Sequence, residues 1–131
     1  MRAARLALLG CALLGCARVK PGDLPRLRLG EDACARCGMI VSDERFAAGY
    51  VDADGKSIFY DDLGEFLAAA AERPDLKRVA FVHDAETGRW LPAREAVFVR
   101  IEALPTPMGS GYAAFADQAE ASRYAAARRG S

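Results

Sequence analysis

Two short apolar segments on either side of an Asp54-Gly55 pair place the strongest limit on the fold of this chain. An Asp-Gly pair favours the tight turn of a β-hairpin, because both residues tolerate the backbone angles that the turn requires. Residues 45–52 and 57–60 are therefore predicted to pair as antiparallel strands. This hairpin opens a predicted order of strand, strand, helix and strand.

An amphipathic helix is predicted to follow the hairpin. Apolar side chains recur at the spacing of one helical face, at Leu63, Phe66, Leu67 and Ala70. Asp61 or Asp62 is expected to cap the helix, with Glu65 completing a capping box, and Pro74 to end it. The apolar run at residues 78–83 is predicted to be the next strand.

The rest of the chain repeats this order more faintly. Short strands are predicted at residues 89–91, 96–101 and 112–115, followed by a helix from Asp117 to about Arg128. The alternation of strands and helices predicts an α+β fold, in which helices pack on antiparallel strands.

Composition and charge argue against a nucleic-acid partner and against a membrane-spanning helix. The formal net charge of the 131 residues is zero, and no cluster of Lys and Arg recurs along a face. No nucleic-acid partner is expected, because such binding depends on neutralising phosphates. The chain has no run of about 18 apolar residues, so no transmembrane helix is expected.

The first residues have the pattern of a bacterial export signal. A short basic region precedes a small apolar core, and Leu13-Leu14-Gly15-Cys16 resembles the site at which a lipoprotein signal is cut. Residues 1–15 are therefore predicted to be a signal peptide, with lipid attached to Cys16. The competing site at Cys11 would leave an unusually short apolar region. Residues 16–30 are predicted to be a tether, so the protein should face the periplasm from a membrane anchor.

Three sulfur side chains lie within six residues, at Cys34, Cys37 and Met39. Thiolates and thioethers are soft donors, and soft donors select Cu(I). Gly38 allows the backbone to turn tightly, so that neighbouring side chains can converge. The segment is a candidate Cu(I) site.

Three other interpretations of the two cysteines remain open. A zinc site needs four ligands, and the mature chain offers two free cysteines and one histidine, His83, so zinc would require a carboxylate or a second chain. A thioredoxin-like redox pair should open a helix, whereas Gly-Met-Ile-Val follows Cys37. A structural disulfide is also compatible with an oxidising compartment.

Two further candidates have ordinary explanations when taken alone. His83 is expected at the end of a strand, where a single histidine is more often structural. Met108 lies between Pro107 and Gly109, and a methionine is usually a gap-filler. The flanking proline and glycine nevertheless mark an exposed loop, which is an unusual place for a core residue.

The ordered set of motifs resembles the NosL family, the copper chaperone lipoproteins associated with nitrous oxide reductase. The resemblance is carried by residues 31–40, 60–64, 82–84 and 106–115, together with Trp90 and the site at Cys16. It implies two small ββαβ-like halves at about residues 31–84 and 85–131. Family members continue past the last helix into a final strand, so the second half is expected to be truncated.

The resemblance also implies a function and a site. The chain is expected to carry Cu(I) and to deliver it to an apoprotein, namely nitrous oxide reductase, with an assembly transporter as a further partner. The implied ligands are Cys34, Cys37, Met39, His83 and Met108, and Asp84 or a backbone carbonyl is expected to orient the ring of His83. No catalytic residue is predicted. The alternative from another functional class is a thiol-based enzyme related to organomercurial lyase, because the family's fold is similar to that enzyme's; this argument is an analogy between folds.

Overall fold

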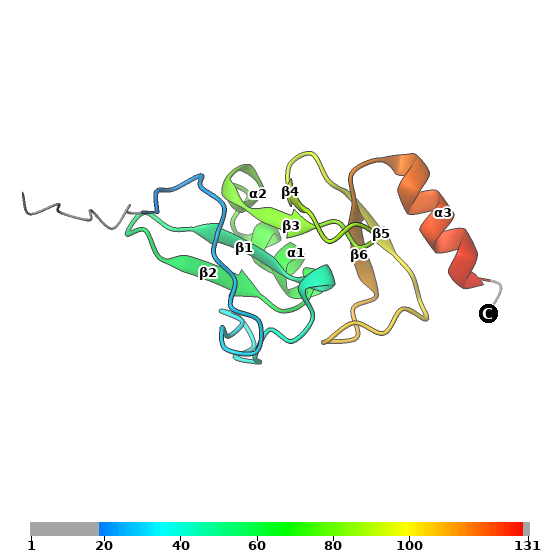
Figure 1. The fold of residues 1–131 in the computed structure, drawn as a ribbon, viewed down its shortest axis with the longest axis horizontal. Helices are drawn as coiled ribbons and strands as arrows, with labels where there is room; N and C mark the ends of the chain where they lie inside the picture. Colours follow the sequence, from blue (N-terminus) through cyan, green and yellow to red (C-terminus); the bar gives the residue numbers. More distant parts are fainter. Residues whose placement is uncertain (1–18, 130–131) are drawn as a thin grey trace, which may run out of the picture.

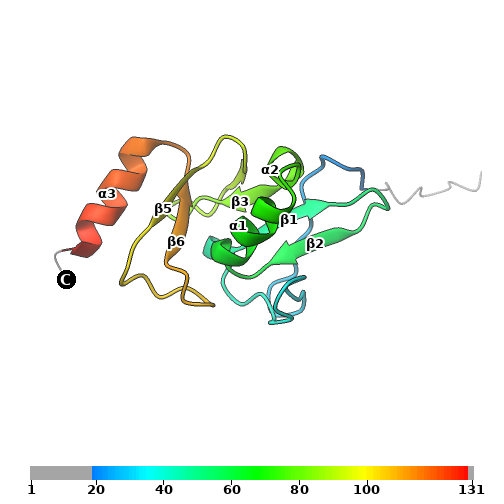
Figure 2. The same cartoon turned by 180° about the vertical axis from the view of Figure 1, so that it is seen from behind.

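The computed structural model describes residues 19–129. They form a four-stranded antiparallel sheet in the order β2-β1-β3-β4, followed by a two-stranded sheet, β5-β6 (Figure 1). Helices α1 and α2 lie against one face of the first sheet, and helix α3 lies on the second (Figures 1 and 2). The predicted α+β class with antiparallel strands is confirmed. No helix in this part of the chain is long and apolar enough to cross a membrane.

The predicted hairpin forms, with one strand shorter than expected. β1 (Ala48–Val51) pairs antiparallel with β2 (Ser57–Tyr60), so that Ala48 lies opposite Tyr60. The predicted strand at residues 57–60 is confirmed. The first strand begins late because η1 (Glu44–Phe46) forms a single 3₁₀ turn, capped by the side chain of Asp43, which accepts from the Arg45 N–H.

Helix α1 (Leu63–Glu72) begins at the predicted cap, Asp62, whose side chain accepts from the Gly64 N–H. Its apolar face, which includes Leu63 and Phe66, is buried against the first sheet. The expected capping box does not form in full, because Glu65 instead makes an ion pair with Arg36 at 3.3 Å.

Only the second half of the predicted strand at residues 78–83 forms a strand. Its first two residues complete the short helix α2 (Leu76–Val79), and β3 (Phe81–His83) follows. The fully buried Leu76 anchors this extra helical turn in the core. β3 then pairs with β4 (Trp90–Pro92), so the first sheet extends past the expected boundary between the halves at residue 84.

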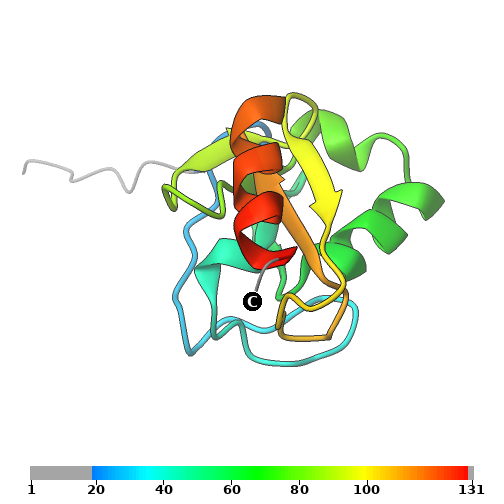
Figure 3. The ribbon, with the colours of Figure 1, turned by 90° about the vertical axis from the view of Figure 1, so that its right-hand side faces the viewer.

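The second unit consists of β5 (Val97–Arg100), β6 (Tyr112–Phe115) and α3 (Gln118–Arg129). The two strands pair antiparallel, and α3 crosses them (Figure 3). Phe115 and Tyr124 form the centre of its core, with ring centroids 4.9 Å apart. β6 also contacts α1 and β3, so this unit packs directly on the first sheet and its helix.

Part of the predicted tether packs on the domain. Leu27 contacts a small core of Val41, Ala47 and Phe59 on the sheet face opposite α1. The Arg26 N–H donates to Ser57 Oγ at 3.3 Å. Within residues 16–30, the second half is thus bound to the sheet rather than free of it. The predicted signal peptide at residues 1–15 and the lipid site at Cys16 lie outside the described residues.

Candidate metal site

The two cysteines lie on a tight loop attached to the edge of β2. The Cys34 N–H donates to the Met39 carbonyl at 2.7 Å, and the Gly38 N–H donates to the Cys34 carbonyl at 3.0 Å. Gly38 has φ of 76°, a left-handed conformation that glycine adopts easily because it has no Cβ. The Ala35 N–H donates to the Phe59 carbonyl at 2.8 Å, which fastens the loop to the sheet.

This loop brings the two thiols together with a carboxylate that is distant in sequence. Ligand atoms of Cys34, Cys37 and Asp61 all lie within 4.8 Å of one another. Both cysteines are free thiols; Cys34 is buried and Cys37 is half-buried. The Cys37 N–H points at Cys34 Sγ, at 3.4 Å. The group provides two soft donors and one hard donor around a single point.

Asp61 is the member of this group that sequence reasoning missed. Its side chain is 1% exposed, and its Oδ1 accepts from the Cys37 thiol at 3.2 Å. Its Oδ2 is buried with no hydrogen-bond partner among the described residues. A buried carboxylate oxygen without a partner is costly, so this atom is poised to receive a proton donor or a cation. The available signal was the Asp61-Asp62 pair, since one helix needs only one N-cap.

Burial controls the protonation of Cys37. Removal from water raises the pKa of this thiol to about 12, and hydrogen bonding to Cys34 and Asp61 acts in the same direction. Cys37 is therefore a neutral thiol at physiological pH. A metal that binds its sulfur has to displace the proton.

Asp62, the next residue, is 0% exposed, and both of its carboxylate oxygens accept two hydrogen bonds. Oδ1 accepts from the Gly64 N–H at 2.7 Å and from the Ser110 hydroxyl. Oδ2 accepts from the Thr106 hydroxyl at 2.7 Å and from the Met108 N–H at 2.8 Å. Burial raises the pKa of Asp62, but these hydrogen bonds together outweigh it, so the pKa lies below its ordinary value. Asp62 thus joins the first turn of α1 to the loop at residues 106–110.

The two candidate methionines both have exposed side chains. Met39 is 54% exposed and Met108 is 44% exposed. Because the Met108 main chain is bonded to Asp62, and Asp61 contacts Cys37, the loop that carries Met108 reaches the end of α1 where the thiols lie. The cysteine loop and the Met108 loop share the lower edge of the molecule in Figures 1 and 3. The structure therefore gathers Cys34, Cys37 and the main chain of Met108 at one end of the sheet.

His83 is not brought into this group. It is 3% exposed, its ring lies 3.6 Å from that of Trp90 between centroids, and its Nδ1 lies 3.4 Å from the Ala47 carbonyl oxygen. Successive residues of a strand point to opposite faces, and Val82 points toward α1. His83 accordingly points to the other face, away from the core in which Cys34 is buried. Burial lowers its pKa, which keeps the ring neutral.

Asp84 does not orient the His83 ring. Its Oδ1 accepts from the N–H groups of Glu86 and Thr87, at 2.9 and 2.8 Å, and its Oδ2 accepts from the Ala116 N–H at 3.0 Å. The carboxylate therefore shapes the turn after β3 and ties it to the second unit. The alternative expectation, a backbone carbonyl beside the ring, agrees with the position of Ala47.

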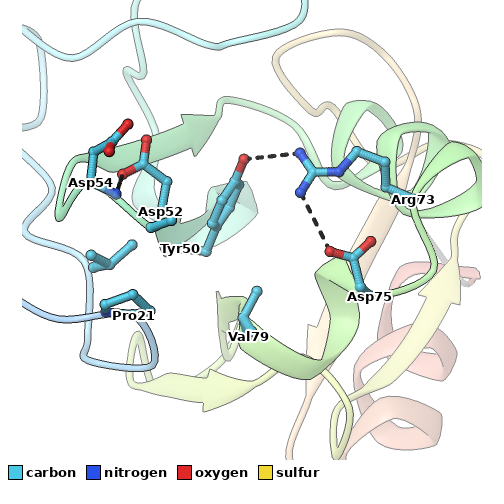
Figure 4. Close-up of a pocket in the computed structure, with 9 residues that line it drawn as sticks. Pro21, Tyr50, Asp52, Asp54, Arg73, Asp75 and Val79 are labelled. Atoms are coloured by element: carbon cyan, nitrogen blue, oxygen red, sulfur yellow. Dashed lines mark hydrogen bonds and ion pairs between the residues drawn. The ribbon is translucent and has the colours of Figure 1, made fainter.

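A hollow of about 470 Å³ lies elsewhere on the first sheet, between the hairpin and α2 (Figure 4). Its lining includes Tyr50, Asp52 and Arg73, and the Arg73 guanidinium contacts both the Tyr50 hydroxyl and Asp75 at 3.4 Å. None of the predicted ligands lines it. The candidate site is therefore the thiol and carboxylate group at the end of α1, not this hollow.

Comparison with known proteins identifies a family and a similar fold. The NosL family model matches residues 28–131. The fold is similar to that of the copper chaperone NosL from Shewanella denitrificans, a solved structure with a TM-score of 0.63 and 18% sequence identity. The match covers 79% of this chain and 86% of that one. No curated protein sequence matches the chain.

Proposed function

The chain belongs to the NosL family, and on this premise we propose that it binds Cu(I) and delivers the ion to another protein. The observation that carries the proposal is the pair of free thiols beside Asp61, whose second oxygen has no hydrogen-bond partner within residues 19–129. Thiols become soft thiolate donors once deprotonated, and these favour Cu(I) over hard cations. The similar solved structure is named a copper chaperone. These points support a carrier role rather than an enzymatic one.

Binding would exchange a proton for copper. As Cu(I) approaches Cys37, the thiol proton already points at Asp61 Oδ1, so the carboxylate is in position to accept it. Cys34 lies close enough to supply the second sulfur. The thioethers of Met39 and Met108 are exposed, neutral and easily displaced, which suits a site that has to release its ion.

Delivery is proposed to occur outside the cytoplasm. The expected receiver is nitrous oxide reductase, with an assembly transporter as a further partner, and the proposed anchor is lipid on Cys16. Replacing Cys16 by serine should move the protein from the detergent phase to the aqueous phase of a detergent partition. Wild-type protein found in the aqueous phase would contradict the anchor, while leaving copper binding untouched.

Copper binding is tested by titrating the reduced, metal-free chain with Cu(I) against a coloured competing chelator. Cys11 and Cys16 are replaced by serine, so that Cys34 and Cys37 are the only thiols. We expect one tightly bound Cu(I) per chain, and loss of that binding in Cys37→Ser. Cu(I) that the competitor removes completely at equimolar concentration would refute the proposal. Transfer is then measured as copper gained by metal-free nitrous oxide reductase after separation.

Zinc is the second candidate metal, because Asp61 supplies the carboxylate that the sequence alone did not locate. Cys34, Cys37 and Asp61 are three ligands of kinds that zinc accepts, one short of a closed structural site. The same chain is therefore titrated with Zn²⁺. Retention of Zn²⁺ in the presence of one equivalent of Cu(I) would favour a zinc protein, whereas displacement favours the copper carrier.

The same three groups also suit the rival enzyme. Paired thiols bind mercury, and Asp61, which is placed to take the proton of the Cys37 thiol, can pass that proton to the departing carbon. Release of inorganic mercury from an organomercurial, with turnover, would favour this activity. Stoichiometric binding without release favours the carrier.

A further inference from the structure

Asp62 does more than cap a helix. An N-cap needs one acceptor, for the N–H of the second or third helical residue, and Gly64 fills that role here. Three further donors reach the same carboxylate from the loop at residues 106–110, namely the Thr106 hydroxyl, the Met108 N–H and the Ser110 hydroxyl. These partners are 44 to 48 residues away in the chain.

The loop lies directly on the first turn of α1. A Cβ built on Gly64 would collide with the Cβ of Ser110, so glycine is what allows this close approach. Within the loop, the Gly111 N–H donates to Thr106 Oγ1 at 3.2 Å, and the Gly109 N–H donates to the Thr106 carbonyl at 2.9 Å. The main chain at Met108 is thus held on both sides, while its side chain stays exposed.

We propose that Asp62 is a positioning residue that holds the Met108 thioether beside the Cys34, Cys37 and Asp61 group, and so sets the strength of copper binding. This inference rests on the proposed function. Asp62 itself does not touch the metal; it fixes the backbone from which Met108 reaches. The side chain remains free to swing, which lets the thioether close over the ion and open for transfer.

The physical reason is pre-organisation. A free loop loses conformational freedom when one of its side chains binds a ligand, and that loss weakens binding. A loop whose Met108 N–H is already bonded to a buried carboxylate has little freedom left to lose. Loss of a group that orients a metal ligand typically costs about 10- to 100-fold in metal affinity.

The test measures Cu(I) affinity of the chain with Cys11 and Cys16 replaced by serine, in two backgrounds: Met108 and Met108→Leu. Asp62→Asn keeps an oxygen for the helix cap but turns an amide N–H toward the Met108 N–H. Thr106→Val removes one hydroxyl, and Thr106→Ser keeps it. We expect Asp62→Asn and Thr106→Val to weaken Cu(I) binding about tenfold or more, and Thr106→Ser to match wild type.

Both losses should vanish in the Met108→Leu background, where no thioether remains to be positioned. Equal losses in both backgrounds would overturn the proposal, because Asp62 would then act only on the fold. A Met108→Leu chain that binds Cu(I) as tightly as wild type would also overturn it. If Asp62→Asn does not fold, the Thr106 pair decides alone.

Asp84→Asn is the matched control. Asp84 is equally buried and also accepts an N–H from the second unit, at Ala116, but it does not contact the metal group. We expect this variant to lower stability without changing Cu(I) affinity, and a loss of affinity as large as that of Asp62→Asn would overturn the positioning role. Failure of the wild-type chain to bind Cu(I) would instead refute the proposed function.

Discussion

Asp61 and Asp62 are neighbours in sequence and equally buried, yet their surroundings are opposite. Asp62 accepts from two backbone N–H groups and two hydroxyls, and its charge is fully compensated. In the part of the chain that the structure describes, one oxygen of Asp61 accepts from a thiol and the other has no partner. The first arrangement holds two segments of the chain together, and the second leaves a costly acceptor beside two sulfur donors. One carboxylate therefore stabilises the fold, and the other is kept at the expense of stability.

The largest effect on stability is expected from removing the carboxylate of Asp62. Asp62→Ala leaves four donors without their acceptor, and hydrogen bonds to a charged group contribute about 1.5–3 kcal/mol each. We expect the free energy of unfolding to fall by about 3 kcal/mol or more, measured by urea denaturation. The control is Asp117→Ala, which removes an exposed cap that accepts only the Glu120 N–H and should cost about 1 kcal/mol. Equal effects of the two variants would contradict the role of Asp62.

This stabilisation should depend on pH in a defined direction. The folded state lowers the pKa of Asp62, so its contribution is complete above the ordinary carboxyl pKa and is lost as pH falls through the folded value. The difference in unfolding free energy between wild type and Asp62→Ala should therefore shrink in acid. A difference that stays constant down to about pH 2, well below the ordinary carboxyl pKa of about 3.9, would show that the charge of Asp62 is not what stabilises the fold.

Asp61→Asn should separate stability from binding. The substitution replaces a buried carboxyl group, one oxygen of which has no hydrogen-bond partner among the described residues, so the metal-free protein should unfold no more easily than wild type. Cu(I) affinity should nevertheless fall about tenfold, the lower end of the effect of a group beside a metal ligand. Urea denaturation and chelator competition measure the two quantities on the same sample. A destabilised variant with normal affinity would reverse the interpretation.

Cu(I) affinity should weaken steadily as pH falls. The pKa of Cys37 is raised to about 12 in the metal-free chain, so at every pH below that value copper has to displace the thiol proton. Each proton released makes affinity about tenfold weaker per pH unit. Competition titrations between pH 6 and 8 measure this slope. A flat profile would mean that neither thiol loses a proton on binding.

The smallest effect is expected at His83. Because its ring packs against Trp90 and lies on the face of β3 opposite Val82, His83→Gln should change Cu(I) affinity by less than about twofold, or about 0.4 kcal/mol. Its effect should appear instead as lower stability, measured in the same denaturation experiment. A large loss of Cu(I) affinity at unchanged stability would restore His83 to the set of ligands.

Local patterns in the sequence were sufficient to predict much of the fold and to locate the loop that carries the two thiols. The Asp-Gly turn and the helical spacing identify β2 and α1, and the clustered sulfurs identify the loop at Cys34. Asp61 was harder to assign because its partner, Cys37, lies 24 residues away in the sequence, and only folding brings the two side chains together. The place of His83 outside this group could not be predicted either, since the face of β3 on which it lies depends on how that strand pairs with its neighbours.

The most direct measurement is X-ray absorption at the copper edge of the Cu(I)-loaded chain carrying Cys11→Ser and Cys16→Ser. Binding by Cys34 and Cys37 predicts a first coordination sphere dominated by sulfur, with one sulfur fewer in Cys37→Ser and no change in His83→Gln. A sphere of nitrogen and oxygen that Cys37→Ser leaves unaltered would contradict copper binding at the thiol and carboxylate group.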